Sequence, residues 1–520
     1  MKLIELATYA DAQRHFASAK LWELFDGNRE RLNLAHECVD RHATSRDRVA
    51  VRIAHADGRD EIVTFQRLAE ASSQVAHLLR AKGVGAGDRV AIMLEPGLAF
   101  YAALFGAIKA GAIAVPLFIL FGPDGLRLRL NDCSPRVLFT SADKAPIAVG
   151  INGLEVQIAD DAFVASLAQF PAHYDWSSKA DDLAVFQYTS GTTRELPEAV
   201  RHTHRAIVVV MMAALYATGI RPGDEFFCPS SPAWGHGLWH GTLAPLAMGL
   251  TIGTYAGRFD ADRLMRALQN YRVTNLSAAA THYRMMKNAG TASRYRFAMQ
   301  KLTFTGEPLD SDTRTFARAA FGKAPLSFYG TTEIGVALAS YPGATDIDPP
   351  DGALGLPMPG LRVEVQDATG KVCDPNTIGE IKLWRRDCWI PTKDRGWTDA
   401  GGWFFHAGRS DDVIISAGWT MSAVEIEDIL LKHPDIKEAA AIGVPDPTRG
   451  LVVKAFLVTP RTLDDDFVRE VQDFVRERLS AHEYPRQIAV VDELPKTPAG
   501  KVNRKMLRDR EAAQRSSPTT

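Results

Sequence analysis

The feature that most constrains the fold is a strand–helix–strand rhythm that occurs twice in the chain. Arg89 to Met93 is a short apolar run, Leu98 to Ala110 reads as an apolar helix closed by Gly111, and Ile113 to Leu117 is a second apolar run. Short apolar runs that alternate with such helices are typical of a parallel sheet covered by helices. The same order returns from Thr251 to Ala278. The rhythm therefore predicts two α/β layers within one large domain.

Later in the chain the pattern changes twice. Short runs such as Arg362 to Gln366 and Gly379 to Trp384, separated by Gly, Asp and Pro turns, predict a small, antiparallel, β-barrel-like part of the large domain. Beyond it the chain restarts with its own α+β pattern, in which Asp464 to Leu479 carries apolar residues at helical spacing. We therefore predict three parts: an N-terminal domain over 1–410, a small C-terminal domain over 411–510 and a disordered tail over 511–520.

Composition excludes several classes of protein. With 520 residues, 46% of them apolar, the chain can bury more than one core. Its 60 basic and 62 acidic residues leave a net charge of -2, so no global basic field favours nucleic acid or anionic lipid. The five cysteines are scattered and include no C-x-x-C pair, which argues against disulfides or a thiolate zinc site and favours the cytoplasm.

The ends and apolar runs of the sequence also bear on location and partners. No signal-peptide-like core follows Met1, and no charge-free apolar run is long enough to span a bilayer. We therefore expect a cytoplasmic protein whose partners are small molecules. The sequence leaves the oligomeric state open, with a homodimer as one alternative.

Four polar stretches in a fixed order carry the chemistry. Thr189-Ser190-Gly191-Thr192-Thr193 follows a strand-like run, and its hydroxyls and flexible backbone can surround a polyphosphate, although alone it also fits a Ser/Thr turn. Tyr329-Gly330-Thr331-Thr332-Glu333 offers a carboxylate of the kind that magnesium prefers. Asp394 and Arg409 form the third stretch, and a loop rich in Pro and Gly ends at Lys501. Phosphate donors, a metal ligand, an acceptor for a ribose diol and a mobile cation are what a reaction between a carboxylate and ATP requires.

With these motifs in this order, the chain resembles the adenylate-forming superfamily of acyl-CoA synthetases, nonribosomal adenylation domains and luciferases over nearly its whole length. Phe121 to Arg127 and Ser231 to Gly235 are most similar to carboxylate–CoA ligases of the medium-chain and aromatic-acid kind. The resemblance implies an AMP-forming ligase that uses ATP, Mg²⁺ and CoA: it forms an acyl-adenylate, and a thiolate then displaces AMP. Two alternatives stay open, an enzyme that loads a carrier-protein thiol in trans and a non-catalytic, ligand-binding relative.

The resemblance also assigns roles to residues. Those implied to bind the ATP phosphates are Thr189, Ser190, Gly191, Thr192 and Thr193, and those implied to bind adenine or ribose are Gly306, Glu307, Pro308, Tyr329, Asp394 and Arg409. The implied catalytic residues are Thr332 at the α-phosphate, Glu333 on magnesium and Lys501, which bridges the substrate carboxylate and the α-phosphate. The small C-terminal domain is implied to be mobile, rotating about Asp411 so that Lys501 leaves and Gly418 reaches the CoA tunnel.

Three positions bear on the acid and two others depart from the family pattern. Trp234, His236 and Gly330 are candidates for the acyl pocket, although aromatic residues in such a stretch also fit a core. Acetate-activating relatives place a tryptophan where this chain has Gly330, so we expect an acid larger than acetate or propionate. Glu198 stands where the family's phosphate loop has a lysine, which requires Arg194 or Arg201 to replace the cation, and Lys393 stands where a glycine is usual.

Overall fold

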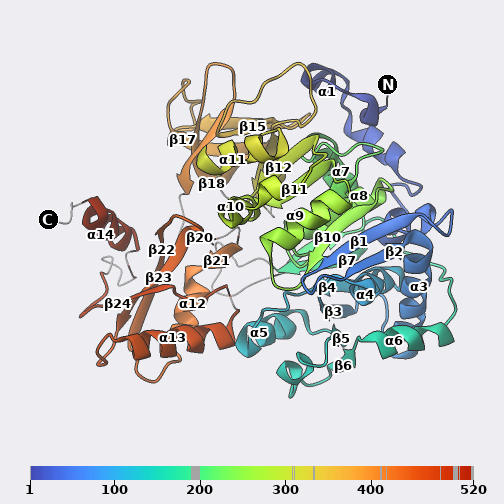
Figure 1. Cartoon of the computed structure of the whole chain (residues 1–520), viewed down its shortest axis with the longest axis horizontal. Helices are drawn as coiled ribbons and strands as arrows, with labels where there is room; N and C mark the ends of the chain where they lie inside the picture. The colour runs from blue at the N-terminus through green and yellow to red at the C-terminus, as the bar shows by residue number, and fades with distance from the viewer. Residues whose placement is uncertain are drawn as a thin grey trace.

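The computed structural model describes residues 2–516, except 189–198, 307–308, 310, 332–333, 410–412, 417–418, 481, 496–501 and 503. A large N-terminal domain occupies one side of the molecule, and a smaller C-terminal domain, coloured orange to red in Figure 1, lies beside it. Two α/β layers, an antiparallel part and a small α+β domain are all present, which confirms the predicted fold class.

The first α/β layer is a six-stranded sheet in the order β6-β5-β3-β4-β7-β8. Its strands are β3 (Arg89–Met93), β4 (Ile113–Pro116), β5 (Val137–Thr140), β6 (Glu155–Ile158), β7 (Leu183–Tyr188) and β8 (Ala199–Thr203). All neighbours pair in parallel except β7 and β8. Helix α4 (Leu98–Lys109) joins β3 to β4, so the predicted strand–helix–strand unit is confirmed to within one residue at each boundary.

Helix α3 (Phe65–Ala81) packs along α4. It begins at Thr64, whose Oγ1 accepts a hydrogen bond from the Arg67 N–H at 3.2 Å, as expected of an N-cap. A Cβ on Gly106 of α4 would lie 2.7 Å from the Val75 side chain, so this glycine permits the close approach of the two helices.

The second layer belongs to a 13-stranded sheet in the order β16-β17-β18-β19-β15-β14-β13-β12-β11-β9-β10-β1-β2. Its parallel part comprises β1 (Val49–His55), β9 (Phe226–Phe227), β10 (Ile252–Ala256), β11 (Asn275–Ala279), β12 (Lys301–Thr305) and β13 (Leu326–Thr331), with β2 (Asp60–Thr64) antiparallel at the edge. The helices over this part are α9 (Ala261–Asn270), α10 (Ala280–Ala289) and α11 (Ser311–Phe321). The second predicted strand–helix–strand passage is therefore also confirmed.

From β13 onward the same sheet becomes antiparallel. Its remaining strands are β14 (Gly335–Ala339), β15 (Ala353–Pro357), β16 (Arg362–Gln366), β17 (Gly379–Arg385), β18 (Cys388–Thr398) and β19 (Phe404–Arg409). The pairing of β13 with β14 shifts register between Tyr329 and Gly330. The change from parallel to antiparallel pairing thus falls on one of the four polar stretches.

The small domain is built on the sheet β21-β20-β23-β22, with β24 beside β23. Its elements are β20 (Val413–Ser416), β21 (Trp419–Ser422), α12 (Ala423–Leu430), β22 (Glu438–Asp446), β23 (Gly450–Val458), α13 (Asp465–Arg478), β24 (Gln487–Val490) and α14 (Arg504–Ser516). The prediction of a disordered tail from residue 511 is wrong for 511–516, because α14 continues to Ser516 and Glu511 pairs with Lys454 at 2.5 Å. A charged partner on the adjacent sheet was not visible in the local sequence.

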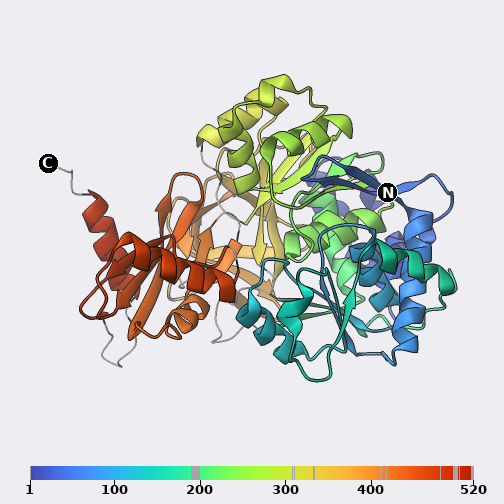
Figure 2. The same ribbon diagram turned by 60° about the horizontal axis from the view of Figure 1, so that its bottom comes forward.

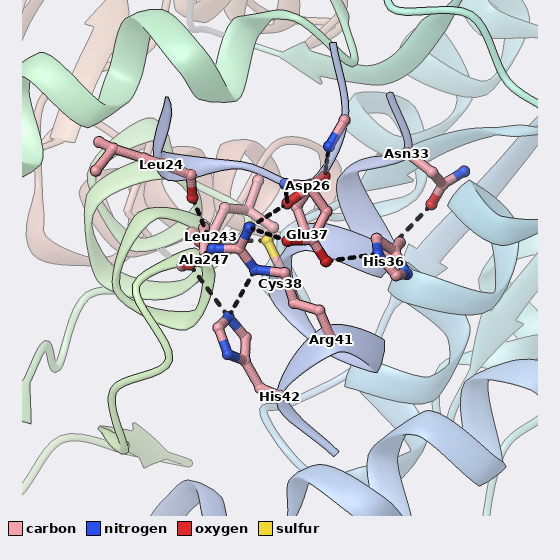
Figure 3. Close-up of polar contacts among 11 residues, drawn as sticks. Leu24, Asp26, Asn33, His36, Glu37, Cys38, Arg41, His42, Leu243 and Ala247 are labelled. Atoms are coloured by element: carbon pink, nitrogen blue, oxygen red, sulfur yellow. Dashed lines mark hydrogen bonds and ion pairs between the residues drawn. The ribbon is translucent and has the colours of Figure 1, made fainter. Parts of the chain in front are cut away.

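A buried polar cluster ties the N-terminal region to the segment that carries the candidate site (Figure 3). The Arg41 guanidinium donates to the carbonyl oxygens of Leu24 at 2.7 Å and Ala247 at 3.0 Å, and it pairs with the fully buried Glu37 carboxylate at 2.6 Å. Cys38 Sγ donates to the Leu243 carbonyl at 3.3 Å. Leu243 ends the π-helix η6 (His236–Leu243) and Ala247 ends α8 (Ala244–Ala247), so the cluster holds the far end of η6 in place.

Candidate active site

One cavity of about 590 Å³ lies where the large sheet changes from parallel to antiparallel pairing. Segments far apart in the sequence line it: Gln187, Tyr188 and His202 from β7 and β8, Met212 and Ala213 from α7 (Ala206–Tyr216), Trp234, His236, Trp239 and His240 in and before η6, Gly306 after β12, Tyr329 and Gly330 on β13, Asp394 and His406 on β18 and β19, and Phe118 and Trp419. The structure therefore brings together the described members of the predicted set: Gly306, Tyr329, Gly330, Asp394, Trp234 and His236.

At one end of the cavity, Tyr329 and Asp394 are joined directly. The Tyr329 hydroxyl donates to Asp394 Oδ2 at 2.6 Å, and Asp394 is only 4% exposed. His406 Nε2 lies 3.5 Å from Asp394 Oδ1. Arg409 is paired with Asp394 across β18 and β19, so the two residues predicted to share a ribose are neighbours in the sheet. An ionised carboxylate accepts several hydrogen bonds, which suits it to a vicinal diol.

Two backbone conformations shape this end. Gly306 has a φ of +95°, a region that favours glycine, and it lines the cavity. Lys393, where the family pattern has glycine, has a φ of +64°. The left-handed conformation explains why a glycine is usual there, and Lys393 adopts it although a Cβ makes it unfavourable.

Another part of the cavity is lined by side chains of α7, of η6 and of the residues just before η6. His236 is 4% exposed and uses both ring nitrogens: Nδ1 lies 3.0 Å from Ser230 Oγ, and Nε2 lies 2.8 Å from Ser277 Oγ. Burial lowers its pKa well below the usual value, so the ring is neutral. His236 therefore forms part of the wall with its hydrogen bonds already made, and Trp234 lies edge-on to it at 5.5 Å between ring centroids.

The π-helix itself presents these side chains to the cavity. A Cβ on Gly237 would lie 2.1 Å from the Ser231 carbonyl oxygen, and one on Gly241 would lie 2.7 Å from Cys228 Sγ. The two glycines therefore let η6 pack tightly against the segment after β9. π-helical turns occur frequently at functional sites, and the side chains of η6 do not follow the spacing of an α-helix.

Four residues in this wall were not among the sequence candidates: Gln187, His202, Trp239 and His240. Trp239 Nε1 donates to Gln187 Oε1 at 3.0 Å, and the His202 ring lies 4.7 Å from that of Trp239. His240 packs on Phe328 at 5.5 Å between ring centroids. Within the described part of the chain, His202 Nε2 and His240 Nδ1 are buried without a hydrogen-bond partner. Burial lowers the pKa of each of these histidines to about 4. The aromatic crowding after Trp234 pointed to this region, but Gln187 and His202 come close only through the fold.

Gly330 lines the cavity, but not for the reason inferred from the sequence. A Cβ at this position would lie 2.0 Å from the Gly335 carbonyl oxygen and 2.7 Å from Val336 Cα, both in β14. The missing side chain therefore allows two strands to approach and does not itself leave space in the cavity. Side chains of α7 and η6, among them Met212, Ala213 and Trp239, line the cavity as well.

The cavity also reaches the small domain. Trp419, the first residue of β21, packs on Phe118 with 4.4 Å between ring centroids and stacks on His482 at 4.3 Å. Ser480 and Glu483 of the small domain line the cavity as well. Val502, which follows the predicted catalytic Lys501 in the sequence, packs in a separate apolar cluster of the small domain with Leu494 and Leu507.

Several predicted residues lie outside the part of the chain that the structure describes. These are Thr189, Ser190, Gly191, Thr192 and Thr193, with Arg194 and Glu198, and also Glu307, Pro308, Thr332, Glu333, Asp411, Gly418 and Lys501. No group of three His, Cys, Asp or Glu side chains forms a metal site among the residues that are described. The roles predicted for these positions, including magnesium binding by Glu333, stay predictions.

Comparison with known proteins defines the class. The model of the AMP-binding enzyme family matches residues 39–386, and that of the AMP-binding enzyme C-terminal domain matches residues 425–501. The chain belongs to the AMP-binding enzyme family. This confirms the resemblance to adenylate-forming enzymes that the four polar stretches indicated.

Individual relatives narrow the comparison. Acetyl-coenzyme A synthetase of Bacillus subtilis is 31% identical, over 97% of this chain and 95% of that protein. The 3-hydroxybenzoate–CoA ligase of Aromatoleum sp. is 29% identical, over 86% of this chain and 91% of that protein. Among solved structures, an acyl-CoA synthetase of Brucella canis is 30% identical, with a TM-score of 0.72 over 98% of this chain and 100% of that one. Named acid–CoA ligases thus favour the ligase interpretation over the two alternatives. None of the described helices is long and apolar enough to cross a membrane.

Proposed function

We propose that this protein is an AMP-forming carboxylic acid–CoA ligase. ATP adenylates the acid with release of pyrophosphate, and the thiol of CoA then displaces AMP to give a thioester. The observation that carries the proposal is that one cavity is lined by three sets of residues. These are the bonded pair Tyr329 and Asp394, the wall formed by η6, and Trp419 of the small domain. Nucleotide, acid and thiol each have a place along it.

Each end of the cavity has its own part in the first step. Tyr329 packs on adenine, Asp394 and Arg409 bind the ribose hydroxyls, and the hydroxyls of residues 189–193 surround the phosphates. Thr332 contacts the α-phosphate. Glu333 holds Mg²⁺, which neutralises phosphate charge when bound. Lys501 stabilises the charge that develops between carboxylate and α-phosphate, and its replacement by Ala is expected to slow adenylation on the order of 100- to 1000-fold.

The acid is larger than acetate, and of the medium-chain or aromatic kind. Support comes from the part of the cavity that Met212, Ala213 and Trp239 line, where apolar side chains suit the hydrocarbon of a larger acid. The names of the relatives differ on this point, since one is an acetyl-CoA synthetase and another a 3-hydroxybenzoate–CoA ligase. The cavity favours the second kind of substrate.

The second step uses a different placement of the small domain. Rotation about Asp411 withdraws Lys501 and brings Gly418 to the entering thiol. The position of Trp419, next in sequence to Gly418, against Phe118 at the cavity supports this assignment. We further infer a cytoplasmic protein, because its five cysteines are scattered and free. Assembly as a homodimer, which the sequence leaves open, is tested by light scattering.

Two measurements test the proposal against its alternatives. Acid-dependent exchange of labelled pyrophosphate into ATP is expected, and its absence with every acid in a panel of straight-chain and aromatic acids would leave the non-catalytic interpretation. Release of AMP that requires free CoA is expected next. Exchange without any response to CoA would instead favour a carrier-protein thiol as acceptor.

A further inference from the structure

The backbone of the large domain is bonded directly to that of the small domain. The Gly122 N–H donates to the Leu479 carbonyl oxygen, and Phe121 and Ser480 form an isolated antiparallel bridge. Gly122 is the N-cap of α5 (Pro123–Cys133), and Leu479 is the C-cap of α13. Figure 2 shows α13, in red, lying next to this part of the large domain.

Gly122 has no room for a side chain in this arrangement. A Cβ would lie 2.0 Å from the Glu477 carbonyl oxygen and 2.5 Å from its carbonyl carbon, so a backbone of the other domain fills the space. Yet the dihedral angles of Gly122, φ −74° and ψ 175°, are accessible to any residue. The contact between domains requires glycine here, whereas the local conformation of the loop does not.

The neighbouring contacts place the small domain relative to the cavity. Asp124 Oδ2 lies 3.9 Å from Lys432 Nζ and 3.8 Å from Arg478 Nε, at partly exposed positions where such pairs contribute little. Beyond them, Trp419 packs on Phe118 at the cavity itself. Docking at Gly122 and the approach of Trp419 to the cavity therefore belong to one arrangement of the two domains.

We propose that Gly122 is a positioning residue for the thioester-forming step. Any side chain at this position prevents the small domain from docking with Trp419 at the cavity, and it leaves the adenylate-forming arrangement unaffected. This inference rests on the proposed function, in which the two steps use different placements of the small domain. According to this inference, the thioester-forming step requires a glycine at position 122, whereas the adenylate-forming step does not.

The sharpest variant is Gly122→Ser. Serine is a favoured N-cap residue and tolerates these dihedral angles, so the variant is expected to fold with an unchanged melting temperature. Its Cβ still collides with Glu477. Gly122→Ala serves as a second variant, and Gly85→Ala as a matched control, because a Cβ at Gly85 would lie no closer than 3.6 Å to a neighbour within the same domain.

Both steps are measured in each variant. Pyrophosphate exchange is expected to stay within about twofold of the parent protein. Thioester formation from preformed acyl-adenylate is expected to fall on the order of 100-fold, the effect that a misplacement of about 1 Å can produce. Thioester formation at the parent rate in Gly122→Ser, or equal loss of both steps in a folded variant, would overturn the assignment. A parent protein without exchange would instead refute the proposed function.

Docking is also tested without activity. Cysteines introduced as Asp124→Cys and Lys432→Cys, in a Cys388→Ser background that removes the exposed native thiol, are expected to cross-link with a short bismaleimide. The same pair carrying Gly122→Ser is expected to lose most of this cross-link. Equal cross-linking with and without the serine would show that the domains dock regardless of residue 122, and would refute the inference.

Discussion

Replacement of Asp394 by asparagine is expected to weaken productive use of ATP without disturbing the fold. Asparagine has the same shape, and its oxygen can still accept from the Tyr329 hydroxyl, which lies 2.6 Å from Asp394 Oδ2. What is lost is a negative acceptor, 4% exposed, for the two ribose hydroxyls. Hydrogen bonds to a charged group contribute roughly 1.5 to 3 kcal/mol each, and the amide retains part of one. A loss of about 2 to 4 kcal/mol corresponds to roughly 30- to 700-fold in kcat/KM for ATP.

The assay compares ATP with 2′-deoxy-ATP in pyrophosphate exchange. In the proposed site the missing hydroxyl removes one bond to Asp394, so exchange by the parent protein is expected to be slower. In Asp394→Asn that penalty is expected to shrink, because the two changes remove the same interaction. Asp387→Asn, an exposed position on the adjacent turn, makes the same chemical change away from the cavity and is expected to behave as the parent. An unchanged penalty for 2′-deoxy-ATP in Asp394→Asn would refute the ribose contact.

Three further predictions follow from the geometry. Hexanoate is expected to exceed acetate on the order of 100-fold in kcat/KM, since four buried methylenes contribute about 0.8 kcal/mol each, and a preference for acetate in steady-state assays would contradict the role given to the cavity. Gly330→Ala is expected to destabilise the fold by about 1 to 3 kcal/mol, measured by thermal melting against Gly85→Ala, because its Cβ would lie 2.0 Å from a β14 oxygen. Burial lowers the pKa of His204 from 6.5 to about 4, so the folded state favours the neutral ring. The contribution of this preference to the free energy of unfolding is complete above pH 6.5 and is lost as the pH falls towards 4. A loss on the order of 3 kcal/mol over that window is expected, and urea unfolding of His204→Gln at pH 7 and pH 4.5 should show a smaller difference than the parent.

Local signals explain why much of the fold was predictable. Helix α3 begins at Thr64 because that side chain caps it, and β3 and β4 end within a residue of the apolar runs that predicted them. The prediction of a disordered tail was wrong because the contact that decides it is not local. Polar residues after Arg510 read as frayed, but Glu511 meets Lys454, a residue far away in sequence that the fold brings alongside α14.

The residues of the candidate site also fall into those that local motifs predicted and those that only the fold brings in. Tyr329, Asp394 and Gly306 were predicted from motifs and lie together around one cavity. Gln187 and His202 were not predicted, because neither carries a local pattern and both face Trp239 only once β7 and β8 pack against η6. Motifs identify residues whose chemistry is unusual, whereas ordinary residues enter a site through packing alone.

Glycines show how far a sequence argument can name the right residue for the wrong reason. The missing side chain at Gly330 was taken to enlarge the acyl pocket, yet a Cβ there would point at β14. Gly122 lies in the segment Phe121 to Arg127 that carried part of the resemblance, but the sequence did not indicate why it is a glycine. Its dihedral angles suit any residue, and its need for a bare backbone arises from Glu477 of the other domain. In both cases the constraint is a close approach of two backbones, across the β13–β14 hairpin at Gly330 and across the two domains at Gly122. Substrate size in this protein should therefore respond to changes at Met212 or Trp239, and the balance between its two steps to changes at Gly122.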